Sequence, residues 1–190
     1  MKKIKTADSC YCLRKTPFGP VAALWSVYRG HPKIRRVMLS QSGVSAKQLV
    51  AASFPDAISA SCSEIDVVAD QMVAFLTGDD IRFSLDIARL DLCPEFQRMV
   101  LRAEYGIPRG RVSTYQRIAR YLGKAKGARA VGTALAKNPF PIIIPCHRAI
   151  RSDLTLGGYQ GGLKMKRALL EMEGVLFNSA GRVVTEEIFY

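Results

Sequence analysis

Near residue 90 the runs of β-forming residues in this chain end, and helical spacing takes over. Before that point, runs of β-forming residues are separated by Gly and Pro, which is typical of an antiparallel meander. These runs cover residues 11–15, 21–28 and 34–39. Beyond Pro94, apolar residues recur at helical spacing. A chain of 190 residues can bury two small cores. We therefore predict an α/β N-terminal domain with a small antiparallel sheet over residues 1–90, and a mostly α C-terminal domain over residues 91–190.

Helices are expected in both domains. In the first, residues 45–53 and 64–76 have helical spacing, Gly78 ends the second of these helices, and residues 81–92 form a connector. In the second, a helix begins near Pro94, and two short helices follow over residues 114–122 and 127–137. Two short helices joined by a turn that contains Gly123 predict a helix-turn-helix.

Positive charge is concentrated in one part of the sequence. The chain carries a formal charge of +12, and its residues 98–151 hold 12 lysines and arginines but one acid, Glu104. Such a cluster is typical of a surface that binds a polyanion, although a merely solvated basic surface has the same composition. A hydrophobic content of 48% excludes disorder as the main state.

The cysteines indicate a reducing compartment. There are five of them, at irregular spacing, which does not fit a secreted disulfide framework. No apolar run follows the basic residues at the N-terminus, and no stretch approaches the roughly 18 apolar residues of a membrane span. We expect a soluble cytoplasmic protein, or a nuclear one if the source is a eukaryote, with no membrane partner.

The predicted helix over residues 127–137 is built largely from small residues around a single arginine, Arg129. Small side chains allow a helix backbone to approach another surface closely, and Arg129 could then project beyond that surface. Tight packing against a neighbouring helix would explain the same composition.

Cys146 is the best candidate for a reactive group. It follows three isoleucines between prolines, which we interpret as a short buried strand that places Cys146 at its end. A buried cysteine is often an inert apolar residue, but the neighbouring His147 and Arg148 would favour a thiolate. A phosphatase loop would require arginine where Ser152 stands, and a papain-like hydrolase would depend on the distant His31. Structural zinc needs about four ligands in paired spacing, which the sequence does not clearly provide, so we predict no metal and no cofactor.

Five short motifs occur in order around and after Cys146. They are Asn138-Pro139, Pro145-Cys146-His147-Arg148, Gly157-Gly158-Tyr159, Gly161-Gly162-Leu163 and Leu169-Leu170-Glu171-Met172-Glu173-Gly174. Together they closely resemble the O6-alkylguanine-DNA alkyltransferases, densely over residues 91–177 and more weakly in the N-terminal domain. The resemblance implies a ribonuclease H-like N-terminal domain and a C-terminal domain with a helix-turn-helix.

The resemblance also implies direct-reversal DNA repair that consumes the protein. Cys146 would take the alkyl group from O6-alkylguanine, with O4-alkylthymine as a further candidate substrate, and would keep it as a thioether. His147 would remove the thiol proton through a bound water, and Glu173 would orient His147. Tyr115 would donate a proton to the leaving guanine, and Asn138 would hold the active-site turn.

Further positions match DNA-contacting and pocket residues of that family. The expected DNA contacts are Thr114, Tyr115, Ala128, Arg129, Ala130, Gly132 and Arg148. The expected pocket residues are Pro141, Ser152, Gly157, Tyr159 and Lys166. The target base would be flipped out of the duplex from the minor groove, with Arg129 filling the vacated stack. We expect a monomer that binds double-stranded DNA.

Two positions depart from the family pattern, and two other functions compete with repair. Leu154 stands where the family commonly has glycine, and Gln160 follows Tyr159 where a small or aromatic residue is frequent. A damage-binding module would lack the reactive cysteine, whereas Cys146 is present. A cysteine hydrolase would turn over repeatedly and would not need a basic helix pair.

Overall fold

The computed structural model describes residues 9–190, which divide into two compact units. The first unit runs up to Leu92 and also includes Pro139–Ile143. The second unit contains Cys93–Asn138 and Ile144–Tyr190. The chain therefore passes from the second unit to the first and back again just before Cys146.

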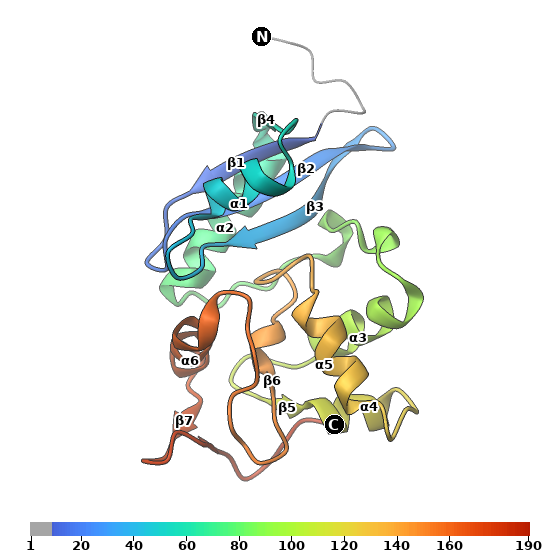
Figure 1. The fold of residues 1–190 in the computed structure, drawn as a ribbon, viewed down its shortest axis with the longest axis vertical. Coiled ribbons are helices and arrows are strands. Elements are labelled where there is room, and N and C mark those ends of the chain that lie inside the picture. The colour runs from blue at the N-terminus through green and yellow to red at the C-terminus, as the bar shows by residue number, and fades with distance from the viewer. Residues whose placement is uncertain (1–8) are drawn as a thin grey trace. The chain divides into compact units, whose positions relative to one another are not determined.

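The first unit is a four-stranded sheet with a helix on each face (Figure 1). Its elements in chain order are β1 (Cys10–Arg14), β2 (Val21–Tyr28), β3 (His31–Leu39), α1 (Ala46–Ser53), β4 (Ile58–Ser59), α2 (Ser63–Thr77) and two 3-10 turns, η1 (Leu85–Ile87) and η2 (Leu90–Leu92). The strand order is β3-β2-β1-β4. The first three strands pair antiparallel, as predicted, but β4 pairs parallel with β1. The prediction of a wholly antiparallel sheet was thus wrong, because α1 carries the chain across the sheet and returns it in the direction of β1.

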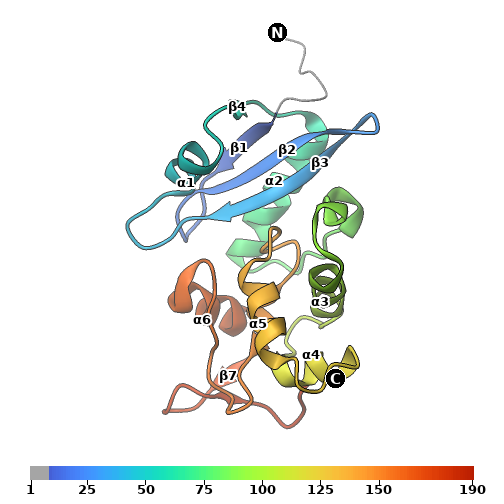
Figure 2. The same cartoon turned by 45° about the vertical axis from the view of Figure 1, so that its right-hand side comes forward.

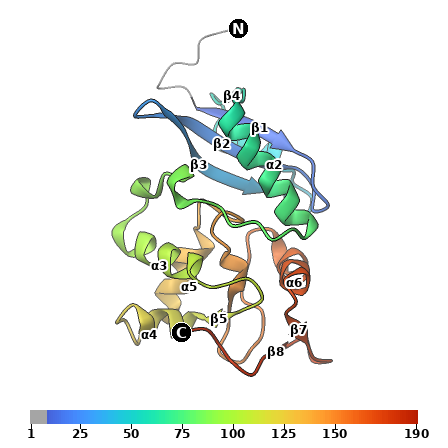
Figure 3. The same cartoon turned by 180° about the vertical axis from the view of Figure 1, so that it is seen from behind.

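Strand β2 forms the centre of this unit and is buried over most of its length. Ala22 and Leu24 pack with Val50 of α1 on one face. The alternation of a strand places Ala23 and Trp25 on the other face, which α2 covers (Figures 1 and 3).

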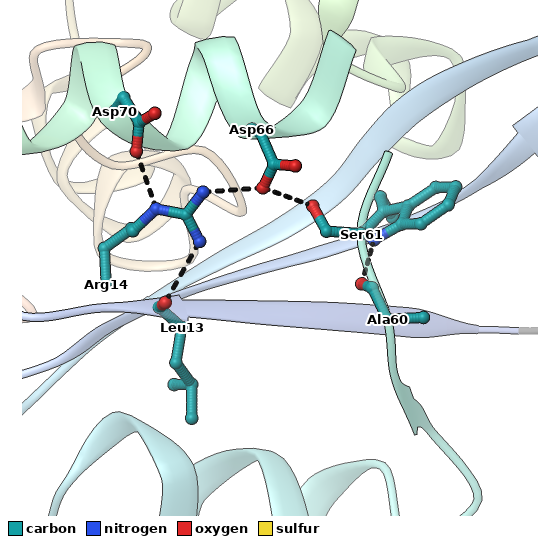
Figure 4. A network of polar contacts seen from close by, with 7 residues as sticks. Leu13, Arg14, Ala60, Ser61, Asp66 and Asp70 are labelled. Carbon is teal, nitrogen blue, oxygen red and sulfur yellow. Dashed lines mark hydrogen bonds and ion pairs between the residues drawn. The ribbon is translucent and has the colours of Figure 1, made fainter. Parts of the chain in front are cut away.

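A polar network joins β1 to α2 at the edge of the sheet (Figure 4). Arg14 donates to Asp66 and Asp70 of α2, each at 2.6 Å, and Asp66 also accepts from the Ser61 hydroxyl at 2.7 Å. Beside it, the Trp25 indole donates to the Ala60 carbonyl at 3.0 Å. These bonds fix α2 against the strand on which Arg14 lies, and they account for the charges on this side of α2.

The second unit is mainly helical (Figures 1 and 2). Its elements are α3 (Glu95–Tyr105), β5 (Ser113–Thr114), α4 (Tyr115–Tyr121), α5 (Ala128–Ala136), the 3-10 turn η3 (Cys146–Arg148), β6 (Ala149–Ile150), α6 (Gly162–Met172), β7 (Leu176–Phe177) and β8 (Val183–Val184). Helices α4 and α5 pack against each other, and α3 packs against α5. The short strands β5 and β6 pair in parallel, which places the start of α4 beside the segment that follows η3.

The isoleucines before Cys146 do not form the predicted strand. Residues 142 and 143 form a turn, and Ile142 has a left-handed φ of 76°. The prolines at positions 139, 141 and 145 have no N–H to donate, so this segment cannot form a regular ladder. Its apolar side chains are buried as expected, and Cys146 is delivered by a turn rather than by the end of a strand.

The C-terminal residues pack along the start of α4. The Ser113 hydroxyl donates to the Phe189 carbonyl at 2.7 Å, and the Arg117 guanidinium donates to the Tyr190 carbonyl at 2.7 Å. The Tyr190 ring stacks on Tyr121 with centroids 4.0 Å apart. The beginning and the end of α4 are both held by this segment.

Over the described part of the chain, none of the helices combines the length and the apolar character needed to cross a membrane.

Candidate active site

Cys146 lines a cavity of about 380 Å³ in the second unit. It is the first residue of η3, and only 5% of its surface is exposed. The cavity is lined by residues from α4, α5, η3 and the segment after β6, which are Tyr115, Gly132, Leu135, Ala136, Cys146, Arg151, Gly157, Gly158, Tyr159 and Gln160. The thiol thus faces a space large enough for a small planar molecule.

Burial governs the acidity of this thiol. It raises the pKa of Cys146 to about 12, although a hydrogen bond from Asn138 and the positive charge of Lys166 act in the opposite direction. The negative charge of Glu104 raises the pKa further. At neutral pH the thiol is therefore protonated and needs a base before it can act as a nucleophile.

A buried histidine follows the thiol in the sequence and is paired with a buried carboxylate. His147 Nε2 lies 2.9 Å from Glu173 Oε1, and both side chains are buried. Burial lowers the pKa of His147 against the opposing effect of Glu173, so the imidazole is neutral at neutral pH. Because a carboxylate only accepts, Nε2 carries the hydrogen and Nδ1 is the basic nitrogen.

Glu173 is held as an anion by its partners. Burial alone would raise its pKa, but hydrogen bonds from His147 and Arg148, together with the charges of both, lower it to about 2. Arg148 donates to Glu173 through Nε at 2.8 Å and through Nη2 at 2.7 Å. This forked pair is the strong, geometrically specific kind of charge-assisted bond.

The assignment of Arg148 as a DNA contact was wrong. Its side chain is buried, and its remaining nitrogen Nη1 donates to the Ile107 carbonyl at 2.7 Å. With its donors occupied inside the unit, Arg148 orients the carboxylate that orients His147.

Tyr115 and Gly157 form a tight part of the cavity wall. Burial raises the pKa of Tyr115 to about 12, with further contributions from Glu104 and Cys146. A Cβ added to Gly157 would overlap the Tyr115 hydroxyl, so this wall has no room for a side chain. The neighbouring Gly158 has open space around it and does not share this restriction.

Lys166 does not line the cavity but lies buried behind it. Its Nζ donates to the Ala149 carbonyl at 2.6 Å and, at 3.4 Å, to the carbonyls of Gly157 and Gly158. Lys166 thus ties β6 to the loop that forms the wall. Burial lowers its pKa to about 8, against the opposing charges of Cys146 and Glu104.

The other predicted residues lie at several places around this unit. Arg129 and Ala130 are exposed on α5, where Ala128 and Gly132 are half-buried, and Gly132 reaches the cavity. Thr114 is buried, and its hydroxyl caps α4 by accepting from the Arg117 N–H at 3.1 Å, so its side chain is occupied within the fold.

Besides Lys166, two other predicted pocket residues do not line the cavity. Ser152 is exposed outside it, and Pro141 belongs to the segment of the first unit. Leu154, which replaces a common glycine, adopts a left-handed φ of 66°.

Sequence reasoning missed two residues that shape the site. Gln160 was noted only as a departure, yet its amide donates to the carbonyls of Ala136 and Asn138 and so joins the cavity wall to the end of α5. Glu104 is fully buried near the thiol, and the available signal was that it is the single acid in the basic window. No cluster of three or more potential metal ligands occurs among residues 9–190.

Comparison with known proteins places this site in a family. The model of the DNA-binding domain of 6-O-methylguanine DNA methyltransferase matches residues 95–175. A methylated-DNA–protein-cysteine methyltransferase of Methanothermobacter thermautotrophicus is 47% identical over 111 residues, which is 58% of this chain and 62% of that protein. One from Pyrobaculum aerophilum is 52% identical over 71 residues, which is 37% of this chain and 47% of that protein. The alignments thus span less than two thirds of these relatives' lengths.

Solved structures cover more of the chain. Mycobacterium tuberculosis O6-methylguanine methyltransferase matches with a TM-score of 0.67 and 29% identity, over 87% of this chain and 92% of that one. Mycobacterium tuberculosis OGT in complex with DNA matches with a TM-score of 0.68 and 31% identity, over 86% of this chain and 91% of that one. From the buried Cys146-His147-Arg148 turn, the family match and these structures, we conclude that the chain belongs to the O6-methylguanine-DNA methyltransferase family.

Proposed function

We propose that this protein repairs DNA by direct reversal, moving the alkyl group of O6-alkylguanine onto Cys146, with O4-alkylthymine as a second candidate substrate. The observation that carries this proposal is the buried thiol that lines a 380 Å³ cavity and is followed in the chain by His147, whose ring is hydrogen-bonded to Glu173. The names of the relatives and the DNA complex of one structural match support it.

The chemistry follows from the protonation states at the site. The thiol is protonated at rest, so His147 takes its proton through a bound water while Glu173 stabilises the resulting imidazolium. The thiolate then attacks the alkyl carbon in line with the C–O6 bond. The new S–C bond forms as the C–O6 bond breaks, and Tyr115 supplies a proton to the departing guanine. A thioether does not hydrolyse, so each protein molecule acts once.

Access to the buried thiol requires that the nucleotide leave the duplex. Extrusion of a base costs a few kcal/mol, and a side chain that fills the gap offsets part of that cost. Arg129 is exposed on α5, and its neighbours Ala128, Ala130 and Gly132 are small enough for a close approach to the minor groove. We assign α4 and α5 to a helix-turn-helix that makes this approach, with little sequence specificity because base edges are not read.

We assign the repair activity to residues 91–190 and a supporting role to residues 1–90 as a ribonuclease H-like domain. We also propose that the protein is a monomer and that it uses no metal or other cofactor. Its five free cysteines indicate a reducing compartment, which is the cytoplasm or, in a eukaryote, the nucleus.

The test is the mass of the intact protein after incubation with duplex DNA that contains O6-methylguanine. A gain of one methyl group per molecule, mapped to Cys146 and abolished in Cys146→Ala, supports the proposal. Cys62→Ala is the matched control, because Cys62 lies in the first unit and does not line the cavity, so its loss should leave methyl uptake intact.

The same experiment distinguishes the two competing functions. A damage-binding module would retain the DNA without any gain in mass. A cysteine hydrolase would process many substrate molecules and recover its original mass. Either result would refute alkyl transfer to Cys146.

A further inference from the structure

Glu104 is a buried carboxyl group to which the proposed mechanism assigns no task. It lies near the end of α3, with none of its surface exposed. Neither of its carboxyl oxygens has a hydrogen-bond partner of good geometry. The other buried glutamate of this unit, Glu173, is satisfied by His147 and Arg148. Burial of an unsatisfied carboxyl group costs stability, and an apolar residue would fill the same space without that cost.

Charged groups from several neighbouring elements act on Glu104. Lys166 of α6 and Arg148 of η3 supply positive charge, and the Ala149 N–H of β6 favours the ionised form. In turn, the negative charge of Glu104 acts on Cys146 of η3 and on two tyrosines. These are Tyr115 of α4 and Tyr190 at the C-terminus.

The charge of Lys166 acts on both Glu104 and Cys146. Its Nζ holds the carbonyls of Ala149, Gly157 and Gly158, so its position is fixed by backbone groups rather than by Glu104. Lys166 therefore acts on the thiol from a fixed place, and the buried carboxyl of Glu104 acts on it with the opposite sign when ionised.

We propose that Glu104 is a positioning residue that tunes the reactivity of the thiol, because its carboxylate, once formed, opposes formation of a thiolate at Cys146. This inference rests on the proposed function in taking Cys146 as the reacting atom. It adds a regulator of thiol reactivity that makes no contact with the substrate.

The proposal has a characteristic dependence on pH. Burial raises the pKa of Glu104 to about 8, although Lys166, Arg148 and the Ala149 N–H act to lower it. Below that pH the carboxyl is neutral and the charge of Lys166 favours the thiolate unopposed. Above it the carboxylate forms and disfavours a second negative charge nearby. Lys166 also loses its proton near pH 8, which removes positive charge in the same range. The reactivity of the thiol should therefore rise less steeply above pH 8 than it would without Glu104.

The test is the rate at which iodoacetamide alkylates Cys146 between pH 6.5 and 9.5, followed by peptide mass mapping because the chain has five cysteines. For Glu104→Gln we expect the wild-type rate below about pH 7.5, and above pH 8 a rate about three- to tenfold higher, because one pKa unit of the thiol corresponds to a tenfold change in thiolate. Glu95→Gln, an exposed substitution in the same helix, should follow the wild-type curve throughout.

Two further variants separate charge from packing. Glu104→Asp keeps the charge and should retain the wild-type pH profile, whereas Glu104→Leu removes it and should behave as Glu104→Gln does. Curves that differ from wild type by the same factor at every pH, or that do not differ at all, would overturn the proposal. Should Glu104→Gln not fold, the comparison of Glu104→Leu with Glu104→Asp decides.

The outcome is independent of the proposed repair activity. Iodoacetamide reacts with the thiol whether or not DNA is a substrate. Methyl uptake from O6-methylguanine DNA by the wild-type protein, measured in parallel, reports on the proposed function alone. If the alkylation rates show the predicted dependence on pH but the wild-type protein takes up no methyl group, the repair function is refuted and the role of Glu104 stands.

Discussion

Gly157 illustrates how single residues define the active-site cavity. A Cβ at this position would overlap the Tyr115 hydroxyl, so Gly157→Ala must displace the tyrosine that we assign as the proton donor. Displacement of a reacting group by about 1 Å costs on the order of a hundredfold in rate. We expect methyl uptake from duplex DNA to slow by about that factor.

Gly158→Ala is the matched control for this prediction. It adds the same methyl group one residue further along the cavity wall, where no atom lies within 4 Å of the new Cβ. Its rate of methyl uptake should stay near that of wild type. Equal rates for the two variants would mean that the close approach of Tyr115 does not limit the reaction.

Glu173 should make the free energy of unfolding depend on pH in the acid range. Its pKa in the folded state is about 2, below the usual value of 4.5, so the stability it contributes is present above pH 4.5 and lost as the pH falls towards 2. The shift corresponds to about 3 kcal/mol. In urea unfolding, Glu173→Gln should be less stable than wild type by about this amount at pH 7, and the difference should shrink steadily below pH 4.5.

Glu171→Gln, in the last turn of α6 two residues before Glu173, provides the comparison. Glu171 forms an exposed ion pair with Arg167, a kind of contact worth about 0–1 kcal/mol. Its removal should change the free energy of unfolding little at any pH. A constant difference between Glu173→Gln and wild type across the pH range would exclude the linkage.

At this scale the sequence predicts the reacting group better than its environment. The motifs placed Cys146, His147 and Glu173 in one site, and the structure brings the last two within hydrogen-bond distance. The role of Arg148 could not be predicted, because an arginine in a basic sequence gives no sign that its donors are used internally. For Glu104, its isolation among cations was visible, but only the fold reveals that it is buried.

The single arginine of α5, Arg129, is exposed. Its removal should affect the repair of duplex DNA but not the reaction with a free base. We expect Arg129→Ala to lower the rate of methyl transfer from duplex DNA at least tenfold. Without the arginine, the gap that the extruded base leaves in the stack stays empty, which costs a few kcal/mol, and about 1.4 kcal/mol corresponds to a tenfold change. Free O6-benzylguanine has no stack to fill, so its transfer rate should be nearly unchanged.

Lys164→Ala on α6 removes an equivalent exposed positive charge and serves as the control. It should weaken neither reaction by more than a small factor. Equal losses on duplex DNA and free base in Arg129→Ala would refute the stacking role and indicate a general effect on the site.

Elements with local signals were predicted well, and elements defined by tertiary pairing were not. Helix α1 begins after Ser45, whose capping box with Gln48 is visible in the sequence, and α2 ends at Gly78 in the left-handed conformation. The two-residue strands β5 and β6 exist only because distant segments meet, so no local pattern marks them. The isoleucines before Cys146 have strand propensity, but the prolines around them prevent a ladder.

For the whole molecule, the net charge of +12 makes affinity for DNA depend on salt. If about six phosphates are neutralised, binding should weaken on the order of a thousandfold between about 50 and 200 mM salt. Fluorescence anisotropy with labelled duplex DNA measures this slope. Alkyl transfer from free O6-benzylguanine, which carries no phosphate, should change little over the same range. An affinity independent of salt would contradict a phosphate-dominated interface.

The path of the chain through its two units limits how the protein can be divided by genetic engineering. A fragment starting at Cys93 encodes every residue that we assign to the reaction, but it also carries Pro139–Ile143, which belongs to the first unit. Phe140, Ile142 and Ile143 in that segment are at most 1% exposed in the whole protein. In such a fragment these side chains would lose the unit that buries them, only a few residues before Cys146. A fragment produced by cutting the chain at residue 92 would therefore carry an exposed apolar loop that is prone to aggregation, close to the nucleophile in sequence. An exchange of the N-terminal domain with that of a relative would have to replace this loop together with the sheet.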